Sequence, residues 1–421
     1  MKKLLKPILF VNLLFALMII YAPLSAQTDS SSTLPPDAPN KAKGGATKFL
    51  LAGKATASWT NTISSMKNPD GTTTTTKAHN FFPEALMLMP LVKINKKLFL
   101  DAQVEVDPNF TGGGASIKLN ELIIYYRLLP NLSVLFGNFS PKYGIFMGVL
   151  DDFTNRYATN PIGMVRGPQT QTGIGIQGGL QAGYSKFNYQ LYLSNGPQHV
   201  IDTVNTGTAN MTGQLNYGNY LDNNRNKAVG GSIGFLPFSN SSLQVDVSGQ
   251  YTGRTGADGN HLDSLYPHSS TSWAVDLNYF HTFNPIMVRV LAEYDATMTQ
   301  NYNYQHISTT DTVSGSPLIP SFNNKLSGWF VGATVRASGS HITFLSNLEL
   351  GCRIGAYNPP KYTDAVTYPD APWGQNAAKQ TTICLTYWAT WKMPLNIAYD
   401  VLTQTNQPTI KTIYTRFIFF F

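Results

Sequence analysis

Ten charged residues are the strongest candidates for chemistry in this sequence. Five lie in a long connection between residues 140 and 170, and five lie on segments with strand periodicity: Lys142, Asp151, Asp152, Arg156 and Arg166, and Asp101, Glu105, Arg289, Glu293 and Arg336. Fixed acids and bases that face one another across water create a local field that discriminates between ions. The set therefore predicts an electrostatic constriction. The alternative for each residue is an ordinary solvated charge.

Bond-making chemistry is not expected. The seven histidines fall mostly in predicted loops, without the spacing of metal ligands: His79, His199, His261, His268, His281, His306 and His341. No Gly-x-Ser-x-Gly segment stands between a strand and a helix. Glu293 and Asp295 share one face of a strand, but a charged face produces that spacing anyway. We therefore expect no enzyme, no catalytic residue, no cofactor-binding site and no metal site.

The segments that carry these charges alternate between two faces. In 243–254, Leu243, Val245 and Val247 alternate with polar residues that include Asp246 and Arg254. The segments 98–107 and 286–295 alternate in the same way, with their charged residues mainly on one face. A period of two residues is typical of a β-strand with one apolar and one polar side. No apolar run after the first residues is long enough for a membrane helix, so a membrane protein of this sequence would have to be a barrel.

Sixteen strands can be placed along the chain. Their spans are 48–60, 81–92, 97–107, 117–128, 132–139, 171–183, 187–194, 228–237, 243–254, 271–283, 286–297, 326–336, 341–353, 380–391, 395–403 and 409–421. Tight turns such as 95–96 and 284–285 alternate with long polar connections such as 61–80, 140–170, 195–227, 298–325 and 354–379. This pattern predicts an all-β fold, a transmembrane antiparallel β-barrel of about 16 strands over 47–421, with short periplasmic turns and long outer loops.

The two ends of the chain agree with this fold. Residues 1–26 combine three lysines with an apolar stretch and Ala26, which predicts a signal peptide, and 27–46 predict a flexible periplasmic lead-in. The last strand, 409–421, is apolar on one face and ends on Phe421, so it should pair with the first strand rather than remain an edge. It resembles the C-terminal signature that the barrel-assembly machinery of bacterial outer membranes reads.

Charge and cysteine content exclude two further classes. The formal charge is +7, and three of these charges belong to the signal lysines, which leaves +4 on the mature chain and gives no case for binding nucleic acid. Two cysteines do not make a disulfide framework. The strand pattern turns Cys352 outward and Cys384 inward, so we expect no bond between them.

A 16-strand barrel is too wide for side chains to fill, so we expect an aqueous channel, with the third outer loop, 140–170, long enough to fold into it. Several short motifs resemble porins of the phosphate-selective porin O and P type from Bacteroidetes-like bacteria. They lie at 119–126, 136–139, 173–178, 189–197 and 222–228. The resemblance implies a passive and trimeric channel for small hydrophilic solutes or ions, such as phosphate. In this family ladders of arginine and clusters of lysine line the pore, whereas here the loop nets only +1 from its five charges.

Two alternatives remain at this point. A plugged transporter of hydrophobic compounds would need an N-terminal plug and an apolar lumen, whereas the inward faces here carry Asp, Glu, Arg and Gln. A structural barrel that binds a surface partner through its long outer loops is the second alternative. All three interpretations place the protein in the bacterial outer membrane, in contact with outer-membrane lipid.

Overall fold

The computed structural model describes residues 48–67, 70–109, 114–145, 156–162, 168, 170–202, 208–218, 227–253, 255–257, 269–299, 306–308, 324–359, 377–405 and 407–421. The signal peptide and the lead-in predicted for 1–26 and 27–46 lie outside these residues and stay predictions. In the described part of the chain no helix has the length and apolar character needed to cross a membrane.

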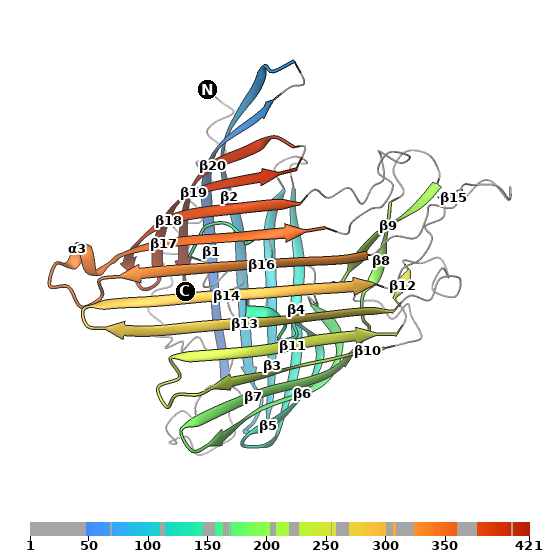
Figure 1. Cartoon of the computed structure of the whole chain (residues 1–421). Helices are drawn as coiled ribbons and strands as arrows, with labels where there is room; N and C mark the ends of the chain where they lie inside the picture. The colour runs from blue at the N-terminus through green and yellow to red at the C-terminus, as the bar shows by residue number, and fades with distance from the viewer. Residues whose placement is uncertain are drawn as a thin grey trace. The chain divides into compact units, whose positions relative to one another are not determined.

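Sixteen strands of the described chain close into one barrel, shown in Figure 1. In barrel order they are β1 (Lys48–Lys67), β2 (Thr73–Lys93), β3 (Leu98–Asn109), β4 (Gly114–Leu129), β5 (Leu132–Phe139), β6 (Gln171–Ala182), β7 (Ser185–Ser194), β10 (Ala228–Leu236), β11 (Leu243–Thr252), β13 (Ser270–Phe283), β14 (Ile286–Thr299), β16 (Asn324–Arg336), β17 (Leu348–Asn358), β18 (Ala378–Thr390), β19 (Met393–Gln404) and β20 (Thr409–Phe420). β20 pairs with β1 in antiparallel register and closes the barrel. The predicted fold class is confirmed, and each predicted strand has its counterpart.

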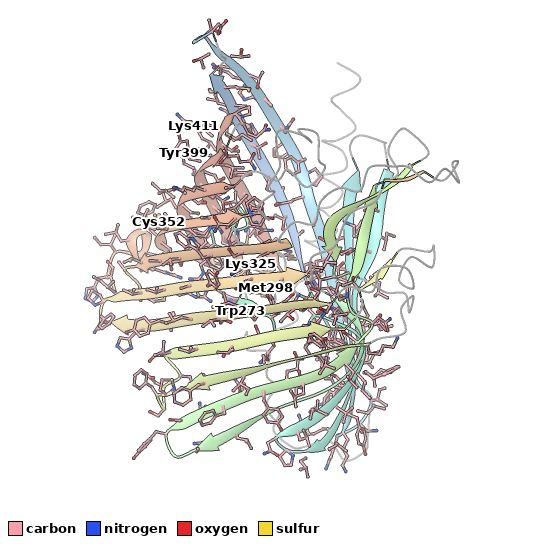
Figure 2. The ribbon with its side chains drawn as sticks, turned by 45° about the vertical axis from the view of Figure 1, so that its right-hand side comes forward. Trp273, Met298, Lys325, Cys352, Tyr399 and Lys411 are labelled. Carbon is pink, nitrogen blue, oxygen red and sulfur yellow. The ribbon has the colours of Figure 1, made fainter. Side chains whose placement is uncertain are left out.

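The two faces of the barrel have opposite chemistry. On β10 the exposed side chains include Val229 and Ile233, whereas Ser232 between them is buried on the inner face. Cys352 is exposed and Cys384 is buried, and both thiols are free, as the strand pattern predicted. Figure 2 shows side chains standing on both faces. An apolar outside around a polar inside is the arrangement of a barrel that contacts lipid.

A β-bulge explains the irregular pattern of β2. The sequence places Glu84 on the same face as Leu86, but the register shifts so that Ala57 pairs with Pro83 and Thr56 with Ala85. Glu84 is therefore the extra residue of the bulge, and its carboxylate accepts a hydrogen bond of 2.9 Å from the hydroxyl of the buried Ser58. A bulge re-aims a side chain in this way without changing the rest of the strand.

Two predicted boundaries are wrong. The connection 61–80 is mostly a hairpin, because β1 continues to Lys67 and β2 begins at Thr73. Its threonines are β-branched and favour strands, a signal that the polar character of the segment hid. The strand predicted to begin at residue 341 begins at Leu348, after the short helix α3 (Thr343–Ser346), whose Thr343 carbonyl accepts hydrogen bonds from Ser346 Oγ and the Asn347 N–H.

The outer connections hold a second sheet that was predicted only as loops. It has four strands in the order β12 (Gly256–Ala257), β8 (Gln198–Asp202), β9 (Thr208–Asn216) and β15 (His306–Ser308). The strands come from three separate connections, so their pairing depends on how these connections meet above the barrel. A local strand signal could not reveal it.

Candidate functional site

Two pieces of the 140–170 connection lie against the inner face of the barrel. We call residues 140–145 the proximal segment and residues 156–162 the distal segment. Both make hydrogen bonds to buried side chains on strands far away in the sequence. The described parts of this connection are therefore inside the barrel, as its length allowed us to expect.

The proximal segment crosses the wall from β4 to β14. Four of its backbone N–H groups donate to wall side chains: Ser140 to Glu121 on β4 (3.1 Å), Lys142 to Gln190 on β7 (2.7 Å), Gly144 to Ser248 on β11 (3.0 Å) and Ile145 to Glu293 on β14 (2.6 Å). The Tyr143 hydroxyl donates to the Trp273 carbonyl on β13 at 3.0 Å. These bonds join the segment to five strands of the barrel.

Gly144 is required by this close approach. Its φ is +61°, and a Cβ at this position would lie 2.6 Å from the carboxylate of Glu293. A side chain would therefore be strained by the backbone conformation and would also collide with the wall. The glycine lets the next N–H, that of Ile145, reach the carboxylate.

Acids surround the proximal segment. Asp246 on β11 is directly opposite Asp276 on β13, which in turn is directly opposite Glu293 on β14. Burial lowers the pKa of the Lys142 ammonium, and the charges of Asp246 and Asp276 oppose that shift. Lys142 is thus the base that this segment brings to an acidic part of the wall.

Arg156 joins the distal segment to β17 and β18. Its guanidinium forms an ion pair of 2.8 Å with Glu349, whose side chain is 1% exposed, and lies 5.2 Å from the ring centre of Trp388. The Trp388 indole N–H donates to the second oxygen of Glu349 at 3.1 Å. The backbone carbonyl of Arg156 accepts from the Cys384 thiol (2.8 Å) and the Asn396 amide (3.0 Å).

Tyr157 fits against two glycines of the wall. A Cβ at Gly332 would lie 2.6 Å from the Tyr157 hydroxyl oxygen, and one at Gly351 would lie 3.1 Å from its ring. The guanidinium of Arg353 lies over the same ring, 5.0 Å from its centre. The ring therefore needs both glycines in order to lie flat on β16 and β17.

Arg353 also fixes the residues that follow. It donates to the Thr159 carbonyl (2.7 Å) and hydroxyl (2.8 Å), and to the Thr382 hydroxyl (3.2 Å). Thr382 donates in turn to Asp400. The Gln380 side chain donates to Asp400 (3.2 Å) and accepts from the Ile162 N–H (2.8 Å). This network connects the distal segment with β17, β18 and β19.

The structure places five of the ten predicted site residues in two regions of the loop and wall. Lys142, Arg156 and Glu293 meet at the contact between loop and wall, and Arg289 lies within the field of Arg156 and Glu349. Arg336 faces the region of α3, where it donates to the Ser346 carbonyl at 2.6 Å.

The remaining predicted residues lie on β3 or outside the described residues. Asp101 and Glu105 lie on β3, where the Glu105 carboxylate accepts a hydrogen bond of 2.7 Å from the Asn120 amide on β4. Asp151, Asp152 and Arg166 lie outside the described residues.

Four contact residues were not singled out from the sequence: Glu349, Arg353, Tyr157 and Thr159. Glu349 and Arg353 alternate with Leu350, Cys352 and Ile354, so strand periodicity could have assigned them to the inner face. No sequence signal identified the two loop residues, because their partners Gly332, Gly351 and Arg353 lie on strands far away in the sequence.

Neither a protein-family model nor a curated relative matches the sequence. Solved structures of bacterial outer-membrane porins share its fold. OprB of Pseudomonas putida has a TM-score of 0.54 at 10% identity over 89% of this chain and 94% of its own. OmpF of Salmonella typhi has 0.52 at 13% identity over 88% and 97%. The outer membrane channel DcaP of Acinetobacter baumannii has 0.50 at 14% identity over 91% and 100%.

At these identities the comparisons show the porin fold. They agree with the predicted outer-membrane setting, and leave the phosphate-selective type as a prediction. Within the described residues no group of three or more His, Cys, Asp and Glu side chains is arranged to hold a metal ion. The expectation that the protein is not an enzyme stays a prediction, and the neighbours are mostly porin channels.

Proposed function

We propose that this protein forms a water-filled channel in the bacterial outer membrane, through which small hydrophilic solutes or ions diffuse passively. The observation that carries this proposal is a closed 16-strand barrel with a polar inner face and a loop bonded to that face. Barrels of this strand number are too wide to be filled by wall side chains, so the loop is the element that would narrow the passage.

The proposed constriction lies between the loop and the uncovered part of the wall. Lys142, Asp151, Asp152, Arg156 and Arg166 are its proposed loop charges. Hydrogen bonds of the described segments reach β4, β7 and strands from β11 to β19, so the uncovered side would include strands such as β3, with Asp101 and Glu105. Charges on both sides would then act on a permeating ion.

Anions such as phosphate are the narrower proposal, and the family resemblance supports it. The lumen wall also carries acids, including the Asp246, Asp276 and Glu293 row, so ion preference has to be measured.

A homotrimer is proposed on the same family resemblance. Its test is the mass of the detergent-solubilised protein before and after heating.

Recognition of Phe421 by the barrel-assembly machinery is proposed as well. Deletion of Phe421 should slow assembly of the barrel in cells.

Single-channel recording tests the main proposal. Purified, refolded protein in a planar bilayer should give steady conductance steps, and the reversal potential in a salt gradient should report the preferred ion sign. Phosphate that lowers chloride current at submolar concentration would support the narrower proposal. Well-folded protein without conductance would contradict the open channel and favour a plugged transporter or a surface-binding barrel.

A further inference from the structure

Two outer connections place a tyrosine hydroxyl on the same short stretch of β13. The Tyr217 hydroxyl lies 2.6 Å from Ser272 Oγ, and the Tyr143 hydroxyl donates to the carbonyl of the next residue, Trp273, at 3.0 Å. Figure 2 labels Trp273 on this strand. Tyr143 belongs to the proximal segment, whereas Tyr217 belongs to the connection between β7 and β10. A second outer connection therefore reaches the wall beside the proximal segment.

The contact of Tyr217 with the wall is buried and polar. Tyr217 is only 4% exposed, and Ser272 is buried as well. The Ser272 hydroxyl lies 2.9 Å from that of Thr297, which is directly opposite on β14. Breaking a buried hydrogen bond of this kind leaves the desolvated hydroxyls without compensation. The Tyr217 side chain is therefore fixed at the outer ends of β13 and β14.

Tyr217 is also close to Tyr143. The two phenols interact electrostatically with each other, and both interact with Asp295 on β14. Tyr143 is buried too. Because buried side chains are close-packed, one large ring in such a place restricts the movement of its neighbour. Tyr217 thus helps to keep Tyr143 on β13.

Tyr217 directly follows the four-stranded sheet of the outer connections, which we call the outer sheet. β9 ends at Asn216, which pairs with Gln198 of β8, and Gln198 pairs in turn with Gly256 of β12. The Asn216 side chain accepts from the Gly218 N–H at 2.9 Å and closes the turn that carries Tyr217. Because the outer sheet joins three connections, it provides a hydrogen-bonded support for this tyrosine.

We propose that Tyr217 is a positioning residue of the channel, through which the outer sheet holds the proximal segment and its Lys142 against the wall. This inference rests on the channel function proposed above. Lys142 is the chain neighbour of Tyr143, so a shift of Tyr143 moves the Lys142 charge. A fixed charge at a constriction acts on permeating ions. The constriction then depends on two outer connections.

Labelling of a thiol under the proximal segment tests the attachment without any need for conduction. Ser248→Cys, in a Cys352→Ser and Cys384→Ser background, introduces a thiol at a buried wall position that accepts from the Gly144 N–H. A water-soluble maleimide should label the refolded barrel slowly, because a shielded group reacts only through local opening. Tyr217→Ala should raise the labelling rate by at least about tenfold, and Tyr217→Phe, which loses only the hydroxyl, by about fivefold.

The matched control for labelling is Tyr251→Ala, which removes an exposed tyrosine of β11 and should leave the labelling rate at the parental value. Resistance of each variant to SDS without heating verifies its fold. A parental labelling rate in folded Tyr217→Ala and Tyr217→Phe would overturn the proposal.

Single-channel recording tests whether the attachment acts on ions through Lys142. Tyr217→Ala should shift the reversal potential in a salt gradient, Tyr217→Phe should shift it less, and Tyr217→Ala should have no such effect in a Lys142→Met background. An equal shift with and without Lys142 would contradict the positioning role. Faster labelling in a barrel that does not conduct would support the attachment by Tyr217 and contradict only the proposed channel function.

Discussion

The proximal segment attaches to the barrel through its own backbone, whereas the distal segment attaches mainly through side chains. In the proximal segment four N–H groups donate to side-chain acceptors of the wall, among them Ser248 and Glu293. In the distal segment Arg156 forms an ion pair with Glu349, and Arg353 of the wall donates hydrogen bonds to the Thr159 carbonyl and hydroxyl. The identity of the loop residues therefore matters more at the distal segment.

The charges differ as well. The proximal segment lies beside Asp246, Asp276 and Glu293 with Lys142 as its nearby base, while the distal segment lies beside both bases, Arg353 and Arg289, and acids, Glu349 and Asp400. Removing one partner of a buried charged hydrogen bond is costly, because the other charge is left buried and unpaired. We infer that, of the two described segments, the distal one is the firmer attachment.

Removal of the Arg353 charge should have the largest effect. Arg353→Met loses the hydrogen bonds to Thr159 and Thr382. It also removes a positive charge that stabilises the negative charge of the buried Asp400. We expect the free energy of unfolding to fall by about 3–5 kcal/mol, the range for opening a buried charged network. Urea unfolding in lipid vesicles measures it, and an unchanged midpoint would refute the firm distal attachment.

Cys384 reports the position of the distal segment in the same variant. Cys384 is 2% exposed, and its thiol donates to the Arg156 carbonyl. In a Cys352→Ser background, a water-soluble maleimide should leave Cys384 unlabelled, and Arg353→Met should expose it to labelling. Equal labelling with and without Arg353 would mean that the segment keeps its place.

Glu349→Gln should have the next largest effect. It removes the partner of Arg156 but keeps an oxygen that can accept from Trp388. Because the Arg156 side chain is 21% exposed, we expect about 2–3 kcal/mol of destabilisation, at or below the low end for a fully buried pair. Open-channel current should become noisier. The control is Asp107→Asn, whose more exposed pair with Lys118 should contribute about 0–1 kcal/mol.

Gly332→Ala tests the shape of the wall under Tyr157. Its Cβ would meet the Tyr157 hydroxyl at 2.6 Å, so we expect a loss of about 2 kcal/mol from overpacking. Tyr157→Phe removes that oxygen and should recover part of the loss in the double variant. Additive losses in a double-mutant cycle would contradict the contact.

Ser248→Ala should have the smallest effect. It removes one neutral acceptor, that of the Gly144 N–H, while the bonds to Gln190 and Glu293 remain. The expected cost is about 1 kcal/mol by urea unfolding. A cost equal to or larger than that of Arg353→Met would contradict the ranking of the two segments.

Much of the barrel could be predicted because its signals are local. The strand 132–139 was predicted with the bounds that β5 has, and the inward and outward sides of Cys352 and Cys384 followed from a period of two. Local signals did not predict strand pairing that is irregular or that joins residues far apart in the sequence. The Glu84 bulge, the threonine-rich hairpin and the second outer sheet are such places.

The site was predicted in part for the same reason. Lys142 and Arg156 could be selected by their type and by the length of their connection, and both lie against the inner face. Their partners Gln190 and Glu349 could not be selected, because many inward polar residues would have served equally well.

The sequence by itself determined that this chain forms a closed barrel with an apolar outside and a polar inside, because alternation and turn spacing are properties of neighbouring residues. Only the tertiary structure decided which inward residues meet the loop. The contact of Arg156 with Glu349, 193 positions away, depends on barrel closure and on the route that the loop takes across the interior. The physical reason is that such a contact has no periodic or local signature in the chain.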